Sequence, residues 1–311
     1  MNDLNLKGVL PATVLPMTVD YEPDFKAFAR YLDWLVAENA VAFAVNMDTG
    51  EGPQLNSAER KRVIEVAADV AQKRCGVVAG VMGGTTHDAV ETALMCKEAG
   101  ADGLVVFPNA AFRNEPLDPR IPYQYHKAIA DATGLPIILF QLAPIFGGVN
   151  YPRETLLRLL EIPEVVAIKE ASFDAQYFAF TKQTLDMSNR PIILLTGNDR
   201  FITESFLMGA EGALLGVCAI GCGMVAAMLK KFQQSDWQGA MAMRLRVQEF
   251  TEVIYKDPVL DYRARCKIAL AHVGVLEMSQ TYVRPPMLQI SAEESELIAA
   301  GLSRAGMVPQ Q

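Results

Sequence analysis

The chain has 311 residues, of which 51% are hydrophobic and only 21% are charged. This composition supplies a large core and excludes a chain dominated by disorder. The formal net charge of −8, with no basic cluster longer than Lys230-Lys231, disfavours contact with a phosphate backbone, so we expect no nucleic-acid partner.

Short apolar runs alternate with longer amphipathic stretches from the amino terminus to about residue 215. The apolar runs predict eight buried strands, at 9–12, 42–45, 77–81, 103–107, 136–140, 165–169, 192–196 and 212–216. The stretches between them predict helices, at 24–38, 57–73, 85–99, 121–132, 153–160, 173–187 and 200–209. Polar residues such as Asn56 or Ser57, followed by Glu59, fit the beginnings of these helices.

Eight regular β/α units in one continuous region favour a closed (β/α)8 TIM barrel, covering residues 1–217, over an open doubly wound sheet. No Gly-x-Gly-x-x-Gly motif follows the first strand, which argues against a nucleotide-binding protein. Residues 218–311 contain no convincing strand and are expected to form a C-terminal helical extension, with helices near 223–255, 258–274 and 291–305.

Neither a membrane segment nor a disulfide framework is indicated by the sequence. No apolar run is long and unbroken enough to span a bilayer, and residues 1–7 lack a basic stretch followed by an apolar core. Five cysteines, an odd number within apolar segments, suit a reducing compartment. We therefore expect a cytoplasmic protein, and we favour buried thiols over a zinc site at Cys218 and Cys222 because no histidine is near them in sequence.

Lys169 closes the apolar run 165–169 and is expected at the carboxyl end of the sixth strand. Catalytic groups of (β/α)8 barrels gather at these strand ends. A lysine held in apolar surroundings has a lowered pKa, and its free amine can attack a ketone. The alternative is a lysine that ends the strand and extends its ammonium to water.

Three groups of residues at strand ends resemble one known family. They are Thr49-Gly50-Glu51 followed by Leu55-Asn56-x-x-Glu59-Arg60, then Ile168-Lys169-Glu170-Ala171, and finally Gly197-Asn198-Asp199 with a downstream Gly-x-x-Gly. Together they resemble the class I aldolases typified by N-acetylneuraminate lyase and dihydrodipicolinate synthase, over essentially the whole chain. The resemblance implies a lyase in which Lys169 forms a Schiff base with pyruvate or another 2-keto acid, without a cofactor.

The same resemblance implies roles for the residues around the lysine. Thr49 and Gly50 would present a hydroxyl and backbone N–H groups to the carboxylate of the keto acid. The alternative for Thr49 is a cap on the following helix. Glu51 and Glu170 are expected to be structural, because a carboxylate would repel the substrate and because Glu170 alternates with Lys169 along its strand. Gly216, at the end of the eighth strand, and Phe140 and Gln141, at the end of the fifth, are expected in the substrate-binding site.

The chain departs from the family pattern at several positions. Phe140 stands where the family usually has a proton-shuttling tyrosine, and residues 143–148 lack the arginine that grips a second carboxylate in the synthase branch. A true dihydrodipicolinate synthase is therefore disfavoured. Asp48 replaces the common threonine before Thr49, and we expect Asp48, with Gln141 or a water, to carry part of the proton traffic. The alternative for Asp48 is a solvated loop carboxylate.

Several alternatives for function stay open at this point. A hydroxylated 2-keto acid substrate is expected, and aldol cleavage and dehydration are equally compatible with an iminium. A family member that has lost turnover and serves as a keto-acid-binding or regulatory protein is the main rival. A metal-dependent aldolase is disfavoured because all three histidines fall on predicted helices. Self-association is expected, since members of the family are commonly tetramers.

Overall fold

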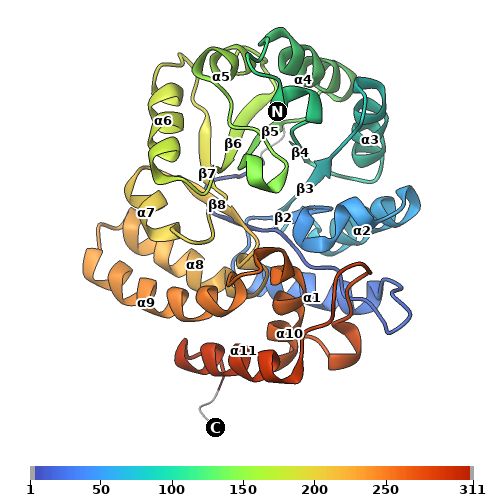
Figure 1. Cartoon of the computed structure of the whole chain (residues 1–311), viewed down its shortest axis with the longest axis vertical. Coiled ribbons are helices and arrows are strands. Elements are labelled where there is room, and N and C mark those ends of the chain that lie inside the picture. Colours follow the sequence, from blue (N-terminus) through green and yellow to red (C-terminus); the bar gives the residue numbers. More distant parts are fainter. Residues whose placement is uncertain (1–3, 309–311) are drawn as a thin grey trace.

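The computed structural model describes residues 4–308, in which eight parallel strands form a barrel surrounded by helices (Figure 1). The first three residues of the amino-terminal stretch considered above lie outside the described residues. The strands are β1 (Val9–Pro11), β2 (Ala42–Val45), β3 (Gly76–Val81), β4 (Gly103–Val106), β5 (Ile137–Leu142), β6 (Val165–Ala171), β7 (Ile193–Thr196) and β8 (Gly212–Leu215).

From β2 to β8 each strand is hydrogen-bonded to the next one in sequence, and β1 pairs with β8. The remaining seam, between β1 and β2, is joined by a parallel bridge between Ala12 and Ala44, with the Thr13 N–H donating to the Ala44 carbonyl at 3.0 Å. The predicted closed (β/α)8 barrel is thereby confirmed.

Helices follow the strands around the outside of the barrel. They are α1 (Phe25–Ala37), α2 (Ser57–Ala71), α3 (Thr86–Glu98), α4 (Arg120–Thr133), α5 (Arg153–Leu159), α6 (Ala175–Asp186), α7 (Ile202–Leu207) and α8 (Cys218–Gln233). Asn56 caps α2 by accepting from the Glu59 N–H at 2.9 Å, while the Glu59 carboxylate accepts from the Asn56 N–H at 2.8 Å. Such a reciprocal cap typically stabilises a helix by about 1 kcal/mol.

Three further helices form a layer on one side of the barrel, beside α1 and α8 (Figure 1). They are α9 (Trp237–Ile254), α10 (Tyr262–His272) and α11 (Ala292–Arg304). The single helix expected over 223–255 is wrong, because the chain turns at Ser235, whose φ is +58°, and α9 begins anew with Asp236 accepting from the Gly239 N–H. Helix α8, which lies against β1 and β8, completes the outer ring of the barrel, so the division at residue 217 stays a prediction.

Side-chain alternation along the strands divides the core into two parts. Leu10, Val78, Ile138 and Ala167 fill the barrel interior, while their neighbours along each strand pack against the surrounding helices. In the same way Lys169 follows Ala167 on the interior face of β6, and Glu170 points to the helical layer. The alternation therefore places one amine inside the barrel near its carboxyl-terminal end.

No helix within residues 4–308 combines the length and the apolar character needed to cross a bilayer. The three histidines lie on α3, α4 and α10, as the sequence predicts.

Candidate active site

A cavity of about 100 Å3 lies at the carboxyl-terminal ends of β5 to β8. Five residues predicted from the sequence line it, and they come from three strands or strand ends (β5, β6 and β8) and from the short 3-10 helix η1 (Asp48–Gly50). These five are Asp48, Thr49, Phe140, Lys169 and Gly216. Further lining comes from the loop after β7, from the ends of β5 and β6 with their following loops, and from the segment between the end of α9 and the start of α10. The C-terminal helices therefore help to enclose the cavity.

Lys169 keeps its amine inside this cavity rather than extending it to bulk water. The residue is only 8% exposed, and Nζ lies 4.1 Å from the centre of the Phe140 ring. Burial lowers the pKa of Lys169 to about 8, although the nearby Asp199 and Asp48 carboxyls oppose this shift. Roughly a tenth of the amine is therefore uncharged at pH 7, far more than for a lysine in water.

Phe140 faces Lys169 across the pair of adjacent strands, since the two residues are in register on β5 and β6. Its ring also meets the Phe107 ring edge to face, with the centroids 4.9 Å apart. A phenyl ring exchanges no proton, so Phe140 can only shape the cavity and exclude water from the amine.

Gln141 does not reach the cavity, and its expected part in substrate binding and proton transfer is wrong. Strand β5 continues to Leu142, so Gln141 lies within the strand and points away from Phe140. Its amide donates to Glu170 at 3.1 Å and to Thr181 at 2.9 Å, and its carbonyl oxygen accepts from the Tyr151 N–H. Gln141 therefore joins β5 to the helical layer.

Glu170 is structural, as expected. Its carboxylate accepts hydrogen bonds from Gln141, from the Ser172 N–H and from the Asn198 amide, the last at 2.6 Å. Burial raises the pKa of Glu170, and these hydrogen bonds oppose the shift. The network holds the ends of β5, β6 and β7 together beneath the cavity.

Thr49 and Gly50 differ in their access to the cavity. The Thr49 hydroxyl lies in the lining, 3.2 Å from the Tyr262 hydroxyl, and α2 is capped by Asn56 rather than by Thr49. The Gly50 N–H instead donates to the Met47 carbonyl within η1 at 3.1 Å, and Gly50 is not part of the lining. A β-carbon at Gly50 would lie 2.7 Å from the Thr13 carbonyl oxygen, so the residue serves close backbone packing.

Glu51 ties this turn to the C-terminal region, which confirms a structural role. It is 1% exposed and accepts from Lys267 Nζ at 2.5 Å and from the Arg284 N–H at 2.9 Å. Because Glu51 follows Thr49 by two residues, this buried ion pair also fixes the position of the Thr49 hydroxyl.

Asp48 is paired with a cation and is not simply a solvated loop carboxylate. Its side chain is 32% exposed, with Oδ1 3.6 Å from Arg263 Nη2, and its backbone carbonyl accepts from Arg263 Nε at 2.6 Å. Arg263 itself is largely buried and lines the cavity. The mouth of the cavity thus carries the Asp48 carboxylate, on η1, and the Arg263 guanidinium, on α10.

Asp199 is an acidic group that the sequence reasoning did not single out. It follows β7, is 5% exposed and lines the cavity, and its Oδ1 accepts from the Val217 N–H at 2.8 Å. Burial raises the pKa of Asp199 to about 6, while hydrogen bonding to the Val217 N–H and to Tyr255 and the charge of Lys169 oppose this rise. The sequence did contain a signal for this residue, because Asp199 belongs to the Gly197-Asn198-Asp199 group at the end of a strand.

Tyr255, Tyr262 and Arg263 were also missed. They come from the end of α9 and the start of α10, where no sequence motif indicates contact with the barrel. The two tyrosine rings stack with centroids 4.9 Å apart. A β-carbon at Gly216 would lie 2.0 Å from the Tyr255 hydroxyl, so the close approach of this tyrosine requires glycine there.

The arrangement combines a partly uncharged buried amine with hydroxyl and carboxyl groups in one small cavity. An amine of this kind can bond covalently to a carbonyl carbon, and the surrounding groups can exchange protons with the product. The fold thus brings a buried amine and groups that can exchange protons to the carboxyl-terminal end of a (β/α)8 barrel.

Comparison with known proteins identifies the family of this chain. Residues 5–305 match the Dihydrodipicolinate synthetase family, and the chain belongs to that family. Its members are class I aldolase-type lyases. A curated relative from Moorella thermoacetica, 4-hydroxy-tetrahydrodipicolinate synthase, is 30% identical over 303 residues, covering 96% of this chain and 98% of the relative.

Solved structures agree in fold. The chloride-inhibited dihydrodipicolinate synthase from Acinetobacter baumannii, complexed with pyruvate, has a TM-score of 0.84 and 25% identity, over 98% of this chain and 100% of that one. A structure described as the first monomeric dihydrodipicolinate synthase variant has a TM-score of 0.87 and 21% identity, covering 97% of both chains.

Proposed function

We propose that this chain is a lyase that binds a 2-keto acid as a Schiff base on Lys169. The observation that carries the proposal is the Lys169 amine, buried in the cavity beside Phe140 with a pKa of about 8. The uncharged amine attacks C2 of the keto acid, and the carbonyl oxygen leaves as water after taking up two protons. The resulting iminium withdraws electrons from C3, which permits proton loss or cleavage of the bond to C4.

The polar groups of the cavity supply binding in this proposal. The Thr49 hydroxyl, held by Tyr262, donates to the carboxylate of the keto acid. Phe140 and Gly216 contact the substrate beside the amine. Asp48, paired with Arg263 at the mouth, serves proton transfer to the outer part of a hydroxylated 2-keto acid. Both aldol cleavage and loss of water fit this arrangement.

Synthesis of 4-hydroxy-tetrahydrodipicolinate is disfavoured in this proposal, although curated relatives carry that name. Phe140 replaces the proton-shuttling tyrosine, and the segment after β5 presents Phe146, packed on Phe173 with ring centroids 5.3 Å apart, where the synthase branch has an arginine. A synthase assay alongside a panel of 2-keto-3-deoxy acids separates the two outcomes, and turnover in the synthase assay alone would contradict this part.

Borohydride trapping with pyruvate tests the Schiff base directly. We expect one reduced pyruvyl adduct, mapped to the peptide that contains Lys169, and no adduct in Lys169→Ala. Lys267 is the internal control, because it is also buried but its amine is held by Glu51 and lies outside the cavity lining. Lack of an adduct with any 2-keto acid would contradict the proposal.

The second candidate is a keto-acid-binding or regulatory protein without turnover. Phe140 favours it, because losing a positioned acid–base group commonly costs on the order of 10²–10⁴-fold in rate. Trapping on Lys169 without turnover of any acid in the panel would select this candidate.

Self-association into a tetramer is proposed as well. Large apolar side chains such as Ile145, Leu245 and Leu288 are more than half exposed and would be covered by a partner copy. Light scattering should then give a mass about four times that of the 34.0 kDa chain. A mass of one chain would place the protein with the monomeric variant instead.

A further inference from the structure

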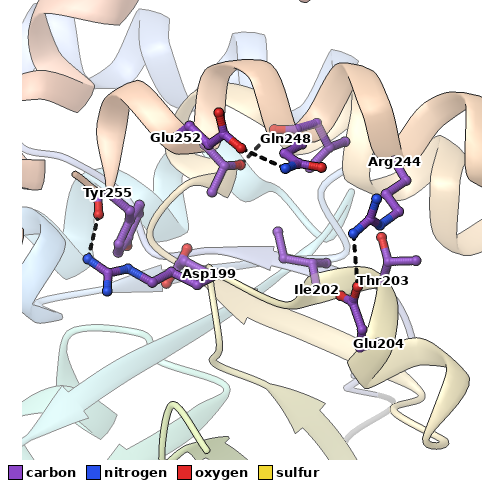
Figure 2. Close-up of a pocket in the computed structure, with 11 residues that line it drawn as sticks. Asp199, Ile202, Thr203, Glu204, Arg244, Gln248, Glu252 and Tyr255 are labelled. Carbon is purple, nitrogen blue, oxygen red and sulfur yellow. Dashed lines mark hydrogen bonds and ion pairs between the residues drawn. The ribbon is translucent and has the colours of Figure 1, made fainter. Parts of the chain in front are cut away.

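A second cavity meets the first one at Asp199 and Tyr255, which line both. It has a volume of about 310 Å3 and lies between α7 and α9 (Figure 2). At the end of this second cavity away from Asp199 and Tyr255, Arg244 forms an ion pair with Glu204. The nitrogen and oxygen atoms are 3.1 Å apart. Asp199 and Tyr255 thus form a wall between the amine's cavity and a polar outer cavity.

Asp199 is held firmly in that wall. One carboxylate oxygen accepts from the Val217 N–H at 2.8 Å, and hydrogen bonding to Tyr255 favours the ionised form. The Arg200 side chain next in sequence donates to the Tyr255 carbonyl at 2.9 Å, which fixes the end of α9 against this loop. The titratable groups that face Asp199 are Lys169 on β6, Tyr255 after α9, Cys218 on α8, and Tyr262 and Cys266 on α10.

We propose that Asp199 is the base that removes the C3 proton of a 2-keto acid bound to Lys169, and that Tyr255 is its positioning residue. The inference rests on the Schiff-base function proposed above. Among the carboxyls of the lining, Asp48 is partly exposed and paired with Arg263. Asp199 is buried, and its charge acts on the Lys169 amine more strongly than that of Asp48. The outer cavity lets the captured proton exchange with water.

The proton step balances without any other reactant. In the iminium, the C3–H bond breaks and its proton passes to a carboxylate oxygen of Asp199. The electron pair of that bond forms the C2=C3 double bond, and the C=N π pair moves onto nitrogen to give a neutral enamine. Return of a proton from Asp199 to C3 reverses the step.

The acidity of Asp199 supports this role. Burial raises its pKa to about 6, so the group is ionised at neutral pH yet is a stronger base than an exposed aspartate. A base of this strength suits proton transfer near pH 7.

Exchange of the pyruvate methyl protons in D2O, followed by NMR, measures the step without knowledge of the natural substrate. We expect the unaltered chain to exchange these protons and Asp199→Asn to do so at least 100-fold more slowly. Borohydride trapping should not slow in Asp199→Asn, because loss of the carboxylate removes a charge that raises the pKa of Lys169. A merely structural role would reduce trapping and exchange in proportion.

The outcomes separate the two proposals. No trapping by the unaltered chain would overturn the Schiff-base function, and this inference with it. Trapping by both proteins, with exchange in Asp199→Asn within threefold of the unaltered rate, would overturn the role of Asp199 alone. A proportional loss of both signals would also overturn it.

Tyr255→Phe provides a second test should Asp199→Asn fail to fold. Removing the hydroxyl raises the pKa of Asp199, so the acidic limb of the exchange rate at saturating pyruvate should move to higher pH. Tyr177→Phe is the matched control, since the Tyr177 hydroxyl donates to the Tyr151 carbonyl at 2.6 Å, away from either cavity lining. An unshifted limb in Tyr255→Phe would contradict the proposal.

Discussion

The buried ion pair between Lys267 and Glu51 offers a stringent test of how the C-terminal helices hold the site. Lys267 is 0% exposed, and its Nζ also donates to the Tyr282 carbonyl at 2.6 Å. Lys267→Met would leave the Glu51 carboxylate buried without its ion-pair partner. Within residues 4–308, the hydrogen bond from the Arg284 N–H would remain. Removing one partner of a buried pair typically costs about 3–5 kcal/mol.

We therefore expect Lys267→Met to lower the free energy of unfolding in urea by about 3–5 kcal/mol. Adding Glu51→Gln should recover about half of the loss, because a neutral amide is buried at smaller cost and still accepts from Arg284. Lys231→Met is the control, since Lys231 pairs with Asp236 at 2.7 Å with both side chains about 40% exposed, and should cost less than about 1 kcal/mol. A loss in Lys267→Met no greater than in this control would refute the reasoning.

Three shorter predictions concern the cavity. The initial rate of pyruvate trapping at low pyruvate should rise about tenfold per pH unit below pH 8 and level off above pH 8, because only the uncharged Lys169 amine attacks. A rate that does not change from pH 6 to 9 would contradict this prediction. Gly216→Ala should displace Tyr255 and slow pyruvate proton exchange, whereas Gly84→Ala, whose added carbon would lie 3.6 Å from its nearest neighbour, should leave exchange unchanged. Asp48→Asn should reduce turnover of the natural keto acid on the order of 100-fold, and an unchanged rate would remove Asp48 from the mechanism.

The barrel was predictable because its strands are short runs of β-branched and apolar residues. Buried parallel strands have no polar face, so each run is conspicuous between amphipathic helices. Strand ends were predicted less well, and the error mattered at β5. Ending that strand at Phe140 made Gln141 a loop residue, whereas two further residues of strand turn its side chain outward.

The missed part of the site has a different cause. Lys169 stands out because an amine at the end of an apolar strand is chemically unusual. Tyr255, Tyr262 and Arg263 lie in ordinary helical sequence, and only tertiary packing brings them back to the barrel. One example is the contact between the Tyr262 and Thr49 hydroxyls at 3.2 Å. Periodicity reports which face of a helix is buried, but not which distant element covers it.

The enclosure of Lys169 by the α9–α10 segment has a consequence for biosynthesis. A ribosome releases β1 to β8 before Tyr255 and Tyr262, so the nascent barrel presents an open mouth to water. Because burial lowers the pKa of Lys169, we expect the lysine to stay hydrated and protonated until the final helices dock. The amine is therefore expected to become a nucleophile only when the last quarter of the chain has been added and packed.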